Sequence, residues 1–223
     1  MPVEKAENIM IYKSFNPQKA LIWRIVHYSN LPWILDNGLY CGNSKIKSPN
    51  WFNIGNPELI QKRADHSVPL PPSGMLNDYI PFYFTPFSPM LRNISTGWGG
   101  IPQLPNEKII ILVSSLHHIA DLGLPFLFTD SHAYSPCANY YSNLSDLNQI
   151  DWPILQHRDF KRDPDDPAKF ERYQAEALIY QHLPINGLYG IICYTELLKQ
   201  RIEQEICARN LNLRVYARPE WYF

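Results

Sequence analysis

The sequence contains little glycine and no long apolar run. Glycine supplies 10 of the 223 residues, and no apolar stretch approaches the roughly 18 residues that a transmembrane helix requires. The first ten residues, MPVEKAENIM, include acidic side chains and no long apolar segment, so we expect no signal peptide. These absences predict a cytoplasmic protein with no membrane contact.

The usual motifs of metal and nucleotide sites are also missing. The four cysteines are scattered without a CxxC pair, and GxxxxGK[ST], GxGxxG, HExxH and GxSxG do not occur. His117 and His118 are adjacent after an expected strand, and adjacent residues of an extended segment point to opposite faces. We therefore expect no metal site.

Neither charge sign dominates the sequence. Lys and Arg number 20 against 21 Asp and Glu, giving a formal net charge of −1. This balance argues against a protein that coats nucleic acid by bulk electrostatics, although it leaves room for a local basic groove.

Apolar residues, aromatics and prolines, in contrast, are plentiful. Hydrophobic residues make up 45% of the chain, which also holds 20 prolines, 6 Trp, 14 Tyr and 10 Phe. A chain of this length with this much apolar material predicts a single folded domain over residues 1–223, with residues 1–20 as an N-terminal extension. Stiff, ordered loops are expected from the proline content.

Hydrophobic patterning predicts an α+β domain. Strands are expected at residues 21–27, 108–115, 126–129, 190–194 and 213–216, and helices at 30–38, 57–62 and 196–210. Residues 79–86 are strand-like, but their prolines predict an edge strand or a bulge. Residues 170–180 are compatible with a helix or a strand.

Three polar residues stand out from their surroundings. Arg24 interrupts an apolar strand, so it requires an anion or a structural carboxylate as partner. Glu176 lies among Ala and Leu residues, which fits either a buried functional carboxylate or an exposed position on an amphipathic segment. Arg63, in a polar segment, would by itself be assigned to a solvated face.

Six segments together resemble a known family. They are IVHYSNLPWILDNGL (25–39), NIGNPELIQKR (53–63), VPLPPSGMLNDYIPFYFTPFSPML (68–91), PFLFTDSHA (125–133), QAEALI (174–179) and PEWYF (219–223). In this order and at these spacings they resemble the DarT family of DNA ADP-ribosyltransferase toxins.

The resemblance implies an ADP-ribosyltransferase fold with a split, mixed β-sheet core and surrounding helices. It places the catalytic carboxylate at Glu176, which favours a strand for residues 174–180, and a second catalytic-site residue at Arg63. A carboxylate at this position would stabilise the positive charge that develops on ribose when NAD⁺ is cleaved.

The resemblance also implies where NAD⁺ and DNA bind. NAD⁺, as co-substrate, would contact Arg24, Ile25, Val26, Asn30, Arg63, Tyr83 and Phe84, although Phe84 could equally belong to the core. Arg24 stands where the family usually has histidine. DNA would contact Met90, Arg92, His132 and Tyr134, with residues 130–166 as the substrate-recognition loop. The basic cluster 157–162 could instead be a salt-bridged face, because aspartates follow it.

The implied function is a toxin that transfers ADP-ribose from NAD⁺ to guanine or thymine of single-stranded DNA, with the Arg24 departure favouring guanine. The implied partner is an antitoxin with ADP-ribosyl hydrolase activity. Transfer to RNA or protein is the alternative, and a degenerate domain that binds nucleotide or DNA without chemistry is a third hypothesis. The presence of both Glu176 and Arg63 argues against the third.

Overall fold

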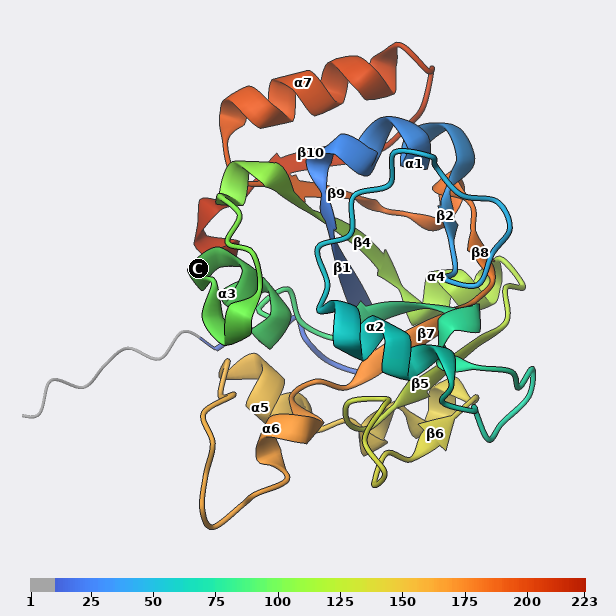
Figure 1. The fold of residues 1–223 in the computed structure, drawn as a ribbon, viewed down its shortest axis with the longest axis vertical. Coiled ribbons are helices and arrows are strands. Elements are labelled where there is room, and N and C mark those ends of the chain that lie inside the picture. Colours follow the sequence, from blue (N-terminus) through green and yellow to red (C-terminus); the bar gives the residue numbers. More distant parts are fainter. Residues whose placement is uncertain (1–10) are drawn as a thin grey trace, which may run out of the picture.

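An eight-stranded mixed β-sheet forms the centre of the computed structural model, which describes residues 11–223. The strand order is β10-β9-β4-β1-β3-β7-β5-β6, and all neighbours are antiparallel except β9 and β10 (Figure 1). The strands are β1 (Leu21–His27), β3 (Tyr79–Tyr83), β4 (Ile109–Ser115), β5 (Phe126–Thr129), β6 (Tyr140–Tyr141), β7 (Glu176–Tyr180), β9 (Gly190–Cys193) and β10 (Arg214–Ala217). The short strands β2 (Leu39–Tyr40) and β8 (His182–Leu183) form a separate pair.

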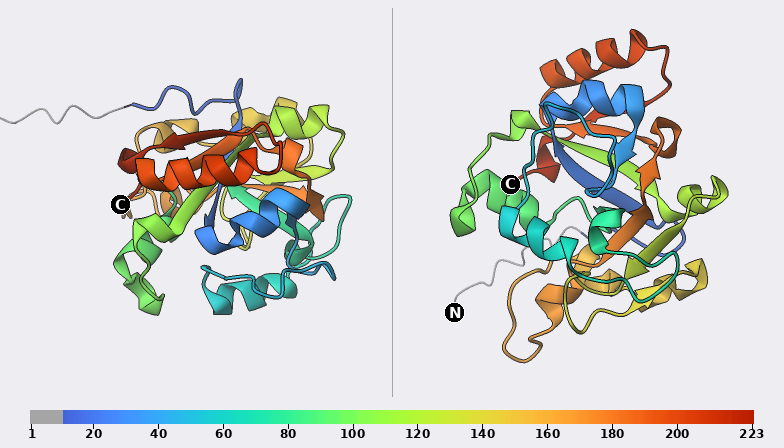
Figure 2. Two further views of the ribbon diagram at one scale, coloured as in Figure 1. Left: turned by 90° about the horizontal axis from the view of Figure 1, so that it is seen from above. Right: turned by 45° about the vertical axis from the view of Figure 1, so that its right-hand side comes forward.

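Helices cover both faces of this sheet. They are α1 (Leu31–Asn37), α2 (Pro57–Ala64), α3 (Pro89–Thr96), α4 (Leu116–Asp121), α5 (Trp152–Gln156), α6 (Lys169–Arg172) and α7 (Glu196–Cys207). The first three lie on one face and α4 lies on the other (Figure 2). No helix within residues 11–223 has the length and apolar character needed to cross a membrane.

The sheet is split between its two central strands. β1 pairs with β4 along its whole length, but it shares only the pair Trp23–Tyr83 with β3. β3 in turn pairs along its whole length with β7. A gap therefore opens between β1 and β3 beyond that single pair, and this agrees with the predicted split, mixed sheet.

The prediction that β3 is an edge strand or a bulge is wrong, because β3 lies between β1 and β7. The prolines led to this error, since a proline cannot donate a hydrogen bond to a neighbouring strand. Pro81 is tolerated because its carbonyl faces the split, where it accepts a hydrogen bond from the Arg24 side chain. The backbone nitrogen of a strand residue faces the same side as its carbonyl, so the missing N–H costs no ladder bond.

Most other predicted elements are confirmed. The ambiguous stretch 170–180 divides into the end of α6 and strand β7, which begins at Glu176. The predicted recognition loop 130–166 contains β6, α5 and a 3-10 helix at Leu144–Gln149. Within the predicted N-terminal extension, residues 1–10 lie outside the described residues, whereas Phe15 is buried and packs against Trp23 with ring centroids 5.0 Å apart.

Candidate active site

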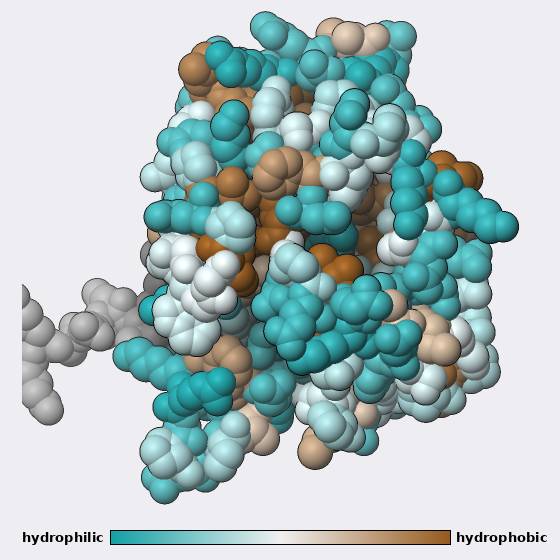
Figure 3. Space-filling view, viewed as in Figure 1, coloured by the Kyte–Doolittle hydropathy of each residue, from teal (hydrophilic) through white to brown (hydrophobic). Residues whose placement is uncertain are grey.

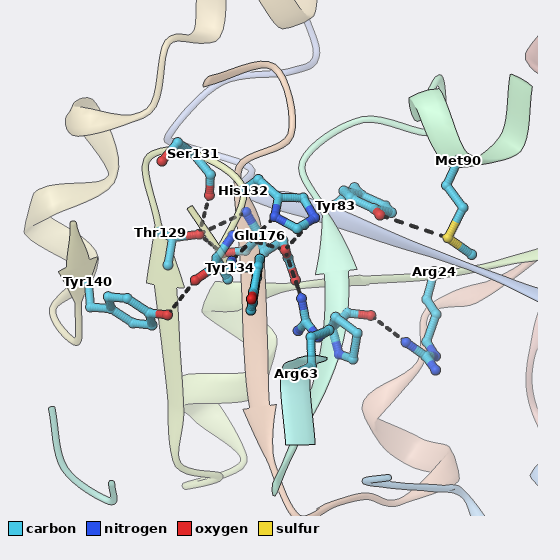
Figure 4. A network of polar contacts seen from close by, with 12 residues as sticks. Arg24, Arg63, Tyr83, Met90, Thr129, Ser131, His132, Tyr134, Tyr140 and Glu176 are labelled. Carbon is cyan, nitrogen blue, oxygen red and sulfur yellow. Dashed lines mark hydrogen bonds and ion pairs between the residues drawn. The ribbon is translucent and has the colours of Figure 1, made fainter. Parts of the chain in front are cut away.

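Glu176 is a buried carboxylate at the start of β7. Only 2% of its surface is exposed, and its direct cross-strand partner is Tyr83 on β3. Its Oε1 accepts a hydrogen bond of 3.0 Å from the backbone N–H of Ala133 and lies 3.8 Å from Nε2 of His132. Burying a carboxylate is costly without such partners, so these groups fix its position (Figure 4).

Arg63 is the cationic partner of this carboxylate. It lies in the last turn of α2, where it is buried, whereas the neighbouring Lys62 is exposed and pairs with Glu58. Nη1 of Arg63 lies 3.1 Å from Oε1 and 3.0 Å from Oε2 of Glu176. Its Nη2 is buried and has no hydrogen-bond partner within residues 11–223. Arg63 lines the first cavity described below, and the donor capacity of this nitrogen is unused among the described residues.

Arg24 lies in the split of the sheet without a carboxylate partner. Its Nη1 donates a hydrogen bond of 2.7 Å to the carbonyl of Pro81, and its buried Nε has no partner among the described residues. Burial, and secondarily the nearby Arg63, lowers the pKa of Arg24 to about 10. The sequence predicted either an anion or a structural carboxylate as the partner of Arg24, and no carboxylate of residues 11–223 forms an ion pair with it.

A cavity of about 450 Å³ occupies the split, a volume typical of small-molecule sites. Arg24, Ile25 and Val26 on β1 form one wall, and Tyr79, Pro81 and Tyr83 on β3 form another. Arg63, Glu176, His132 and Met90 also line it, together with much of the segment 40–56. This face of the molecule is hollowed, with apolar residues at the bottom of the hollow (Figure 3).

The structure separates two residues that the resemblance placed together. Tyr83 lines the cavity, and its hydroxyl lies 3.9 Å from Sδ of Met90. Burial raises the pKa of Tyr83, and Glu176 adds to the rise. Phe84 is fully buried and packs edge-on against Phe128 and Trp152. It belongs to the core, because successive residues of a strand point to opposite faces.

A second hollow, of about 490 Å³, adjoins the first at His132. Its other lining residues are Tyr134, Ser135, Pro136, Phe170, Glu171 and Gln174. Of the four residues predicted to contact DNA, Met90 and His132 line the first cavity and His132 and Tyr134 line the second. Arg92 is exposed on α3, lines neither, and lies 6.0 Å above the ring of Phe160.

The sequence did not single out two supporting residues. Thr129, at the end of β5, accepts a hydrogen bond of 3.2 Å from the backbone N–H of Glu176 and donates one of 2.6 Å to the carbonyl of Ser131. Tyr140 donates a hydrogen bond of 2.6 Å to the carbonyl of Ala133. Both contacts shape the turn that presents the Ala133 N–H to Glu176, and only the position of Thr129 at a strand end hinted at such a role.

No group of three or more His, Cys, Asp and Glu side chains within residues 11–223 could hold a metal ion. The arrangement instead offers one carboxylate and two arginines with unused donors around a cavity. Such a site can bind an anionic ligand and stabilise positive charge beside Glu176.

Comparison with known proteins identifies close relatives. A family model described as "ssDNA thymidine ADP-ribosyltransferase, DarT" matches residues 23–223. A DNA ADP-ribosyl transferase of Escherichia coli O127:H6 is 65% identical over 210 residues, which cover 94% of this chain and 96% of the relative. Another, from Thermus sp., is 34% identical over 213 residues, covering 93% and 98%.

Solved structures agree with these matches. Thermus sp. 2.9 DarT in complex with ADP-ribosylated ssDNA superposes with a TM-score of 0.85 at 32% identity, covering 93% of this chain and 98% of that one. The same protein in complex with NAD⁺ gives a TM-score of 0.79 at 32% identity, covering 93% and 99%. The predicted ADP-ribosyltransferase fold is therefore confirmed.

Proposed function

Because the chain belongs to the DarT family of ADP-ribosyltransferases that modify single-stranded DNA, we propose that it transfers ADP-ribose from NAD⁺ to thymine and acts as a toxin. The predicted family, the transfer of ADP-ribose to DNA and the use of NAD⁺ are confirmed by the family model and the relatives. The modified base, the toxic effect and the partner are parts of the proposal.

The observation that carries the proposal is the position of Glu176 where the two cavities meet. Glu176 and Arg63 line the first cavity, and His132, 3.8 Å from Glu176, lines both. The first cavity suits NAD⁺, because Arg24 and Arg63 offer unused donors to its phosphates and ribose hydroxyls. The second hollow then leads the acceptor base toward the same carboxylate.

The chemistry required of this site is limited. When the bond between nicotinamide and ribose breaks, its electron pair leaves with nicotinamide and positive charge develops on the ribose. The carboxylate of Glu176 stabilises that charge. In DNA, N3 is the ring nitrogen of thymine that carries a proton. N3 therefore bonds to C1 of the ribose that nicotinamide has left, and the N3 proton passes to a proton-accepting group of the site. Glu176 is the carboxylate placed to accept it.

Thymine takes precedence over guanine because of the family model. Its description names thymidine, and its match over residues 23–223 includes Arg24, the residue that had favoured guanine. Guanine remains the alternative that the experiment below must distinguish.

An arginine beside the second hollow supports a DNA acceptor. The guanidinium of Arg162 lies 4.8 Å above the ring of Phe170, which lines that hollow, whereas the half-buried Arg158 lies 3.7 Å above the core ring of Phe87. Neither forms an ion pair within residues 11–223, because the nearby aspartates bind two other cations. Asp159 and Asp163 contact Lys169, whereas Asp151 and Asp166 contact Arg172. Arg162 is therefore available to a phosphate, and the salt-bridged interpretation of the cluster does not hold for its two arginines.

The test offers NAD⁺ and single-stranded oligonucleotides of equal length, each lacking one base, and detects the mass of one added ADP-ribose. We expect modification of every oligonucleotide except the one without thymine. A requirement for guanine would refute the base assignment, and modification of RNA or protein alone would refute the DNA acceptor. Glu176→Gln should lower the rate at least ~10²-fold, the scale for removing a transition-state stabiliser.

The toxic effect follows from the position of the modification. N3 lies on the pairing edge of thymine, so ADP-ribose attached there prevents base pairing during replication. The partner we propose is an antitoxin that hydrolyses ADP-ribose from DNA. Induced expression of the wild-type chain should stop growth, Glu176→Gln should not, and co-expression of such a hydrolase should restore growth. Equal toxicity of wild type and Glu176→Gln would contradict the proposal.

A further inference from the structure

Residues 44–56, here called the strap, cross the face of the first cavity. The strap contains no helix or strand and runs between α1 and α2 (Figure 1). It supplies part of the cavity lining, including Ile46, Trp51 and Ile54. Any ligand in the cavity therefore lies against it.

The hydrogen bonds that join the strap to the body of the protein meet at one point, while Ile54 packs in the hydrophobic core and Trp51 packs against it. The side chain of Asn30 donates a hydrogen bond of 2.8 Å to the carbonyl of Phe52 and accepts one of 2.8 Å from its N–H. Other hydrogen bonds of the strap within residues 11–223 join its own residues or the chain at its two ends. The ring of Phe52 also stacks on His27, with centroids 4.1 Å apart.

The side chain of Asn30 bonds to the strap and does not cap its own helix. It occupies the N-cap position of α1, where an asparagine side chain usually accepts a hydrogen bond from the first turn, but it makes no such bond. It is 3% exposed, and both polar atoms of its amide are engaged by the backbone of Phe52. Asn30 also lines the first cavity, so its predicted contact with NAD⁺ stays a prediction, and its bonds to Phe52 give it a second task.

We infer that Asn30 is a positioning residue that latches the strap over the NAD⁺ cavity through the backbone of Phe52. The inference rests on the proposed placement of NAD⁺ in this cavity. The strap opens when these two hydrogen bonds and the stacking contact break and Ile54 leaves its core contacts, which admits an extended dinucleotide. Closing the latch then holds the strap against the bound NAD⁺. Losing the latch weakens NAD⁺ binding, and the reacting groups at Glu176 are left in place.

Limited trypsin digestion reports strap opening without any catalysis, because the strap carries two exposed trypsin sites, Lys45 and Lys47. The latch variant is Asn30→Asp, which keeps the acceptor for the Phe52 N–H and replaces the donor to the Phe52 carbonyl with an oxygen. We expect cleavage at these lysines to become at least about fivefold faster, the lower end for an unmade buried hydrogen bond. NAD⁺ should slow this cleavage in the wild-type chain.

Kinetics provide the second measurement. Asn30→Asp should raise KM for NAD⁺ several-fold and leave kcat nearly unchanged. Asn37→Ala is the matched control, because Asn37 lies at the other end of α1 and its side chain, among the described residues, bonds only to the carbonyl of Trp33. Should Asn30→Asp fail to fold by circular dichroism, Phe52→Ala removes the stacking on His27 from an exposed position and should also speed cleavage.

Unchanged cleavage in the latch variants would overturn the inference, and so would a fall in kcat at constant KM. Cleavage could be faster in Asn30→Asp while NAD⁺ fails to protect the wild-type chain. That result would support the latch but refute the placement of NAD⁺ in this cavity. The two failures are thus distinguishable.

Discussion

Arg63 and Glu176 lie 113 positions apart, yet one guanidinium nitrogen of Arg63 reaches both oxygens of the Glu176 carboxylate, at 3.1 and 3.0 Å. The arginine comes from the last turn of a surface helix and the carboxylate from the first residue of a central strand. Each therefore compensates the burial of the other, and the pair links α2 to the sheet beside the first cavity.

Removing only Arg63 should destabilise the fold. The side chains of Arg63 and Glu176 are 9% and 2% exposed, so Arg63→Ala leaves a buried carboxylate without its cation. We expect the free energy of unfolding, measured by urea denaturation, to fall by about 3 kcal/mol. The double variant Arg63→Ala/Glu176→Gln should recover part of this loss, because the amide needs no cation. Additive effects of the two substitutions would contradict this coupling.

Local pattern was sufficient for most of the fold. Strands β1 and β4 were predicted because β-branched and aromatic runs are typical of buried strands, and helix α1 because Pro32 and Gly38 mark its ends. The position of β3 was predicted wrongly. A proline excludes a strand from the interior of a sheet only where strands pair with that proline on both sides, and at Pro81 only β7 pairs with β3. The sequence does not show that β1 diverges from β3.

The candidate site was predicted less from pattern than from resemblance. The neighbours of Glu176 and Arg63 allowed burial or exposure, because their partnership is a contact between distant segments. The attachment of the strap was not predicted, since nothing local to Asn30 indicates that it binds Phe52. Phe84 was misplaced because the resemblance identified an aromatic segment without fixing which side chain faces the cavity.

Arg24 should contribute to ligand binding at some cost to the fold. Its lowered pKa, about 10, means that the charged form is less favourable in the folded chain than in the unfolded one. This cost is fully present at neutral pH, begins to fall as pH rises through about 10, and is gone only above the ordinary pKa of arginine. Arg24→Met should therefore not lower Tm, whereas the affinity for NAD⁺, measured by calorimetry, should fall roughly tenfold. The control is Arg201→Met on exposed α7, and a drop in Tm with unchanged NAD⁺ affinity would contradict this role.

Arg162 should contact a DNA phosphate. It lies over Phe170 beside the second hollow and has no ion-pair partner within residues 11–223. In Arg162→Ala, the slope of log affinity for single-stranded DNA against log salt should decrease by about 0.7, the value for one phosphate contact. Lys199→Ala serves as control, because Lys199 pairs with Glu196 on α7. An unchanged slope in Arg162→Ala would exclude this contact.

Tyr140 should support catalysis without touching the reacting atoms. Its hydroxyl holds the carbonyl of Ala133, whose N–H in turn binds the Glu176 carboxylate. Tyr140→Phe should lower kcat roughly three- to tenfold through a looser turn, with KM for NAD⁺ within about twofold of wild type. Burial raises the pKa of Tyr140 to about 12, so its hydroxyl stays protonated over the assay range and the pH–rate profile should keep its shape. Tyr141→Phe is the matched control, because within residues 11–223 the neighbouring hydroxyl bonds only to Asp130. A changed pH profile in Tyr140→Phe would mean that the phenol itself takes part in proton transfer, and an equal loss in Tyr141→Phe would mean that β6 matters only for stability.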